Sequence, residues 1–107
     1  MLFSHQAIAT IKCQAYPDID DTYSRFVQLA MEPVIEDGKI TGYNIKKLLP
    51  DEQIEALDCI KKSINLGNWR AAYTLSNLYN SGSSNLGIEK DMYLSKEYME
   101  IFNANKE

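Results

Sequence analysis

The corner Leu66-Gly67-Asn68 constrains this chain more than any other feature, because it joins two strongly periodic helical patterns with almost no connecting residues. Gly67 suits the left-handed residue that commonly follows the end of a helix, and Asn68 suits the N-cap of the next helix. Two helices joined this tightly must fold back on each other. The chain is therefore expected to contain an antiparallel helix pair that begins at Pro50.

Apolar spacing defines both helices of this pair and predicts a third helix. The helix before the corner has a predicted core stripe made of Ile54, Leu57, Ile60 and Ile64. The helix after the corner has an apolar face whose alanines allow close approach, and this face comprises Ala71, Ala72, Leu75, Leu78 and Tyr79. Residues 80–87 predict a loop, and Asp91 opens a final helix in which Leu94, Tyr98, Ile101 and Phe102 recur at helical spacing.

The N-terminal half predicts further, shorter helices. Residues 4–14 predict a first helix, which Tyr16-Pro17 interrupts, and a second is expected from about Asp20 to about Met31. Residues 36–44 carry turn chemistry that could hold a loop or one short extended piece, and they are interpreted as a loop. Residues 44–49 are interpreted as a short helix that Pro50 stops. The expected fold class is all-α. One domain spans residues 1–107, with N-terminal helices in 1–50 and the helix pair plus a C-terminal helix in 51–107.

The segment from Glu55 to about Met99 resembles a Sel1-like repeat, a relative of the tetratricopeptide repeat. The resemblance rests on LGN at 66–68, AAYTLSNLY at 71–79, Gly82, the Gly87-Ile88 pair and Asp91. Ser76 stands where the family usually has glycine. The resemblance implies paired antiparallel helices in a superhelical fragment, and a role as a protein-interaction scaffold.

Acidic residues concentrate in one stretch of the chain. The formal net charge is −4, from 11 Lys and Arg against 15 Asp and Glu. This balance disfavours attraction to nucleic acid or to an anionic membrane and favours a basic protein partner. Between residues 16 and 38, Arg25 is the single base, and the acids are candidate partner-binding residues: Asp18, Asp20, Asp21, Glu32, Glu36 and Asp37. Helix capping is an alternative role for the three residues Asp18, Asp20 and Asp21.

The helix after the corner supplies a second set of candidate partner-binding residues, Trp69, Tyr73, Asn77 and Asn80. Trp69 is a candidate anchor, because tryptophan is enriched at binding hot spots. Tyr73 fits a core position at helical spacing or an interface, where tyrosine combines a rigid apolar body with a polar tip. Asn77 and Asn80 fit the polar side of the repeat helix, where a groove would present them, but ordinary solvated positions are the favoured interpretation.

Catalytic and metal-binding chemistry is sparse in this sequence. Cys13 and Cys59 are expected to be buried thiols, with neither a disulfide framework nor a zinc pattern. His5 and Cys13 could share a helix face, but they would lie ~12 Å apart along its axis. The acids near Asp18 lack the glycine and the terminal glutamate of an EF-hand loop. We therefore expect no enzyme, no metal and no cofactor.

Three functions remain open after these observations. The leading hypothesis is a small immunity or antitoxin protein that occludes a basic, nuclease-type toxin, because the chain is short, locally acidic and poor in chemistry of its own. The alternatives are a Sel1-like adaptor in a signalling or stress assembly and a small cysteine hydrolase. The sequence has no apolar run of membrane-spanning length and no signal peptide, so a cytoplasmic location is expected.

Overall fold

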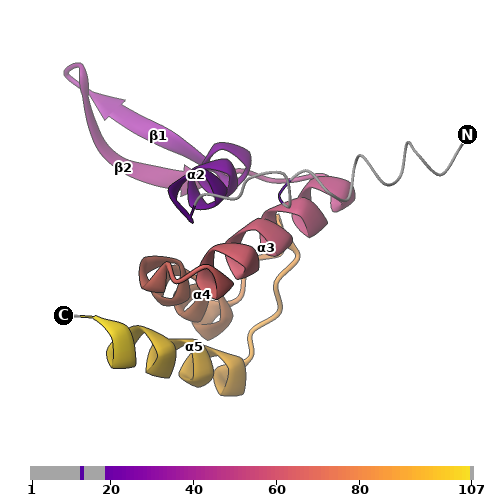
Figure 1. The fold of residues 1–107 in the computed structure, drawn as a ribbon. Coiled ribbons are helices and arrows are strands. Elements are labelled where there is room, and N and C mark those ends of the chain that lie inside the picture. Colours follow the sequence, from indigo (N-terminus) through magenta and orange to yellow (C-terminus); the bar gives the residue numbers. More distant parts are fainter. Residues whose placement is uncertain (1–12, 14–18, 107) are drawn as a thin grey trace, which may run out of the picture.

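The computed structural model describes residue 13 and residues 19–106. Helix α2 is followed by a two-stranded hairpin, three further α-helices and a short 3-10 turn (Figure 1). The elements are α2 (Ile19–Ala30), β1 (Met31–Glu36), β2 (Lys39–Ile45), α3 (Pro50–Asn65), α4 (Trp69–Ser81), η2 (Ser84–Leu86) and α5 (Met92–Asn105). Apart from Cys13, the helix expected over residues 4–14 lies outside the described residues.

The all-α prediction is wrong, because an antiparallel hairpin replaces the expected loop after α2. Asp37 and Gly38 both have positive φ, 53° and 76°, and form the two-residue turn between β1 and β2. A two-residue turn with positive φ at both positions has a backbone twist that matches that of the paired strands, and an Asp-Gly pair readily adopts it. The strands pair from Met31 opposite Ile45 to Glu36 opposite Lys39. The fold is therefore mixed, with helices predominating.

The short helix predicted over residues 44–49 is also absent. Ile45 ends β2, and the residues before Pro50 have no regular structure. Their backbone donors find distant partners instead: Lys46 N donates to Ala30 O at 2.8 Å, and Leu48 N donates to Asn85 O at 3.0 Å. These bonds and the Asn85 side chain, whose Nδ2 donates to Ile45 O at 3.0 Å, fix the base of the hairpin to the helical body.

Helix α3 forms as predicted, but its buried face is rotated from the predicted stripe. Ile54 is 62% exposed, while the buried residues are Ala56, Cys59, Ile60 and Ser63. Helix α3 contacts both α2 and α4, and three of its four buried side chains are small, which allows close approach to two neighbours. Only Ile60 of the predicted stripe is fully buried, and Leu57 and Ile64 are half-buried.

The corner between α3 and α4 is confirmed in its chemistry. Gly67 has a φ of 107°, and Asn68 Oδ1 accepts hydrogen bonds from Arg70 N at 3.0 Å and Ala71 N at 3.2 Å. The predicted apolar face of α4 is buried throughout. Helix α5 then packs extensively against α4, so that α3, α4 and α5 lie as successive layers below the hairpin in the view of Figure 1.

Three side-chain links join the N-terminal part of the chain to the helix pair. Tyr23 Oη lies 2.9 Å from Thr74 Oγ1, and Arg25 Nη2 lies 3.0 Å from Glu55 Oε2 in a half-buried ion pair. Cys13 and Cys59 form a disulfide, with their Cα atoms 5.3 Å apart. The expectation of two separate thiols is therefore wrong, because the fold brings together cysteines separated by 46 residues.

Candidate functional site

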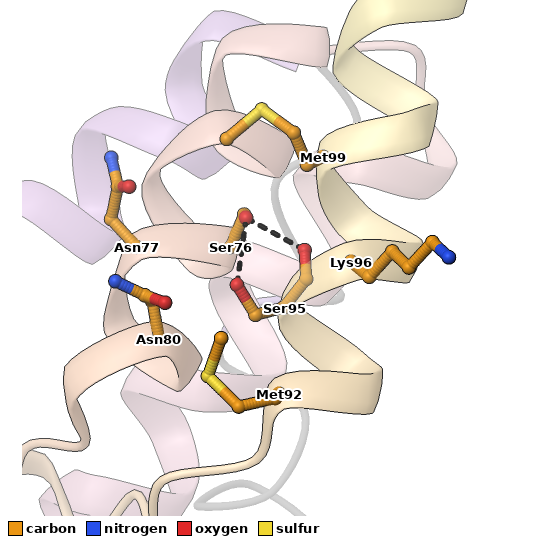
Figure 2. Close-up of a pocket in the computed structure, with 7 residues that line it drawn as sticks. All are labelled: Ser76, Asn77, Asn80, Met92, Ser95, Lys96 and Met99. Atoms are coloured by element: carbon orange, nitrogen blue, oxygen red, sulfur yellow. Dashed lines mark hydrogen bonds between the residues drawn. The ribbon is translucent and has the colours of Figure 1, made fainter.

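A groove of about 330 Å³ lies between α4 and α5. Asn77 and Asn80 border it from α4, one helical turn apart, and both side chains are exposed, as solvated positions would be (Figure 2). The α5 side comes from residues at helical spacing, Met92, Lys96 and Met99. The structure thus brings two predicted partner-binding residues together with three that were not predicted. Their spacing along α5 was a signal that could have found them.

The floor of the groove is a pair of buried serines. Ser76 Oγ donates to Ser95 O at 2.7 Å and lies 3.3 Å from Ser95 Oγ, as the dashed lines in Figure 2 indicate. Small side chains at this crossing let α4 and α5 approach closely, so the longer side chains on either side form walls. Ser76 occupies the position at which the resembled family usually has glycine, and its hydroxyl there joins the two helices.

The groove combines amide, thioether and ammonium groups. Asn77 and Asn80 each offer both donors and acceptors, which match the backbone of an extended peptide. Methionine side chains adapt their shape to apolar partners, and Lys96 supplies a single positive charge at the rim. None of the seven lining residues carries a carboxylate or an imidazole. The groove therefore offers a bound molecule amide, hydroxyl, thioether and ammonium groups.

Trp69 and Tyr73 lie outside the groove, in an aromatic cluster with Phe102. The ring centroids of Trp69 and Tyr73 are 5.7 and 4.9 Å from that of Phe102. The Arg70 guanidinium lies 5.7 Å above the Trp69 ring. Trp69 thus helps to hold the end of α5, while Tyr73 remains 46% exposed.

The predicted acidic residues gather on the hairpin rather than around the groove. Glu32 and Glu36 lie on β1, Asp37 lies in the turn, and all three are exposed. The described residues place no cation within ion-pair distance of these three carboxylates. Asp21 is exposed on α2, the side chain of Asp20 is not among those described, and Asp18 lies outside the described residues.

The predicted site residues therefore do not form one surface. The acids lie on the hairpin, Asn77 and Asn80 border the groove, and Trp69 and Tyr73 belong to the aromatic cluster. The acidic hairpin and α5 lie on opposite sides of the α3–α4 layer (Figure 1). A partner that contacts Glu36 is not expected to reach Asn80 unless it wraps around the body.

A third cluster joins Cys13, Glu55 and Cys59, whose potential ligand atoms lie within 4.8 Å of one another. Its sulfur atoms are paired with each other, and Glu55 accepts hydrogen bonds from Arg25 Nε at 3.3 Å and Nη2 at 3.0 Å. These bonds occupy the groups that a metal would need. A sulfur in a disulfide also has no thiolate to act as a nucleophile, so these residues give the cysteine-hydrolase hypothesis no support.

No protein-family model, curated protein or solved structure matches this chain. In the part of the chain that the structure describes, every helix is too short or too polar to cross a membrane.

Proposed function

We propose that this chain is a non-enzymatic protein-binding module, and specifically an immunity or antitoxin protein that neutralises a basic, nuclease-type toxin by occluding its surface. The observation that carries the proposal is the placement of Glu32, Glu36 and Asp37 on an exposed hairpin that projects from the helical body (Figure 1). A projecting acidic element can enter a concave basic site that a flat helical face cannot.

Electrostatics supports a basic partner for this hairpin. The chain carries a formal net charge of −4, and the three carboxylates have no ion-pair partner among the described residues. Charge pairing with a partner would therefore not compete with an internal ion pair. Complementary charge of this kind raises association rates by roughly 10- to 1,000-fold and weakens with added salt.

Toxicity rescue tests this function. A protein that copurifies with the chain from its host is expressed alone, where it should arrest growth, and then with the chain, which should restore growth. The triple variant Glu32→Lys, Glu36→Lys and Asp37→Lys should fail to restore growth. A matched variant with the same charge change on the helical body, Asp58→Lys, Glu89→Lys and Glu100→Lys, should still succeed. Equal rescue by both variants would contradict a role for the hairpin.

A Sel1-like adaptor is the second candidate, and the α4–α5 groove favours it. Its carboxamides and methionines suit an extended segment of another protein. Asn80→Arg would fill the groove with a long cationic side chain. If the chain is an adaptor, this variant should lose binding across a peptide array while toxin rescue by the hairpin, where present, persists.

The disulfide argues against the cytoplasmic location expected from the sequence, because cytosolic proteins rarely keep disulfides. Thiol trapping in intact host cells distinguishes the cytoplasm from an oxidising compartment. Free Cys13 and Cys59 thiols would support the cytoplasm, whereas a trapped disulfide would support an oxidising compartment.

A further inference from the structure

Asn85, in the loop between α4 and α5, bonds to the chain at the end of the hairpin. Its side-chain Nδ2 donates to Ile45 O, the last carbonyl of β2, at 3.0 Å. Its main-chain oxygen accepts from Leu48 N at 3.0 Å. Asn85 lies 40 residues after Ile45 in the sequence, so these bonds join the base of the hairpin to a distant part of the chain.

The other attachments of the hairpin return to α2 or fix no direction. Strand β1 continues directly from the end of α2. Lys46 N donates to Ala30 O at 2.8 Å, and Lys46 Nζ donates to Gln28 O at 3.1 Å, so both of these bonds lead to α2 as well. The apolar residues at the base pack against the core, but apolar burial is non-directional. The side chain of Asn85 thus links β2 to a part of the body other than α2.

Asn85 is itself held firmly in place. The next residue, Leu86, is buried in the core. Ser83 and Ile88 exchange two backbone hydrogen bonds, of 2.7 and 2.9 Å, across the turn that contains Asn85. Gln53 Nε2, on α3, lies 3.5 Å from Asn85 O. The loop around Asn85 is therefore a fixed part of the helical body.

We propose that Asn85 is the positioning residue of the acidic hairpin and sets the direction in which Glu32, Glu36 and Asp37 face a basic partner. This inference rests on the function proposed for the hairpin. Helix α2 holds the hairpin at the start of β1, and Asn85 holds it at the end of β2. Two points of attachment define a direction, whereas α2 alone would leave a pivot at the start of β1.

The length of the hairpin makes its direction important for binding. Strand β1 has six residues, so the turn lies roughly 20 Å from the base. A pivot of about 10° at the base would move the turn by about 3.5 Å. Such a displacement breaks a charge-assisted hydrogen bond, whose heavy atoms lie about 2.7–2.9 Å apart. Loss of the Asn85 bond should therefore weaken the bound complex, while the long-range attraction, which depends on charge, stays the same.

The rates of association and dissociation separate this role from electrostatic steering. Asn85→Ala removes the side-chain donor without changing any charge. The association rate of the copurified basic partner should therefore stay within about twofold of the wild-type rate. The dissociation rate should rise roughly fivefold or more. Asn85→Asp, which keeps the size of the side chain but replaces the donor with an acceptor, should also raise the dissociation rate.

Two controls distinguish positioning from a general loss of stability. Asn80→Ala makes the same truncation at an exposed position on α4 and should leave both rates unchanged. Gly67→Ala lowers stability at the α3–α4 corner and leaves the contacts at the base of the hairpin intact, so the dissociation rate should not change either. A faster dissociation in Gly67→Ala equal to that in Asn85→Ala would overturn the proposal.

Residual dipolar couplings of the backbone amides test the geometry in the chain alone. In the wild type, the couplings of β1 and β2 should fit the same alignment as those of α3, α4 and α5. In Asn85→Ala, the hairpin couplings should shrink while the helical couplings remain. Hairpin couplings or a dissociation rate that Asn85→Ala leaves unchanged would overturn the proposal. Altered hairpin couplings in a chain that rescues no toxin would support the geometric role of Asn85 and reject the proposed function.

Discussion

Two buried serine hydroxyls at the helix contacts differ in their hydrogen bonding. Ser63 Oγ on α3 has no hydrogen-bond partner among the described residues, whereas Ser76 Oγ on α4 donates to Ser95 O at 2.7 Å. A buried polar group without a partner costs free energy, while one with a partner contributes about 1 kcal/mol. The same substitution should thus have opposite effects at the two positions.

Ser63→Ala should raise the free energy of unfolding by about 1 kcal/mol, and Ser76→Ala should lower it by a similar amount. Urea unfolding followed by circular dichroism measures both. Two losses of equal size would indicate that Ser63 has a partner after all.

Two tyrosines in the α4–α5 interface predict a dependence of stability on alkaline pH. The Tyr79 and Tyr98 rings stack with centroids 5.9 Å apart. Burial raises the pKa of Tyr79 above 10.0, and Asp91 raises it further. Burial also raises the pKa of Tyr98, with smaller contributions from Tyr79 and Glu97. Both phenols therefore favour the protonated form more strongly in the folded chain than in the unfolded chain.

The sign of the effect follows from this difference. Below pH 10 both states are protonated and the full stability is present. As pH rises through the folded-state pKa values, the unfolded chain has already lost its protons, so the free energy of unfolding falls. Tyr98→Phe should make the decline above about pH 10 shallower. An identical pH profile for the variant would rule out Tyr98 as a cause.

At the level of the element, the α3–α4 corner depends on Gly67, whose backbone conformation suits glycine. Gly67 has a φ of 107°, and no heavy atom lies within 4 Å of the place that a Cβ would occupy, so backbone strain alone opposes a side chain there. Gly67→Ala should lower the free energy of unfolding by about 1–2 kcal/mol. Gly42→Ala is the matched control, because its position is equally open and its φ is not positive. Equal melting temperatures for Gly67→Ala and the wild type would argue against the proposed corner.

Local chemistry explains which elements the sequence could predict. Gly67 and Asn68 act through their own backbone and nearest neighbours, so the corner follows from sequence alone. The hairpin depends on pairing between two strands, and the bulge at Thr41 breaks the alternation of Ile40 and Tyr43 that would have indicated a strand. The glycines and the asparagine of residues 36–44 predicted a turn, and Asp37-Gly38 forms one, but a turn does not show what it connects.

The side chains of the candidate site and of α3 were likewise predictable from sequence only in part. Asn77 and Asn80 could be placed on the polar side of α4 because both lie on one face of an isolated helical pattern. The exposure of Ile54 was not predictable from sequence, because it depends on α3 having neighbours on two sides. The pairing of Cys13 with Cys59 depends on how α3 meets a segment 46 residues earlier, which spacing does not reveal.

At the scale of the whole molecule, the disulfide closes the largest loop that any covalent link forms among the described residues. Closing a loop of this length restricts the unfolded chain and typically contributes about 2–4 kcal/mol. Reductant should therefore lower the melting temperature of the wild-type protein, while the Cys13→Ser variant should melt at one temperature with or without it. A wild-type transition that reductant leaves unchanged would mean that the link contributes no stability.

The association rate of the copurified partner tests the central claim, that the acidic hairpin recognises a basic protein, most directly. Stopped-flow measurements at low and high salt would compare the wild-type chain with the Glu32→Lys, Glu36→Lys, Asp37→Lys variant and with its matched body variant. We predict at least a tenfold slower, less salt-sensitive association for the hairpin variant alone. Equal rates and equal salt dependence for all three proteins would contradict the claim.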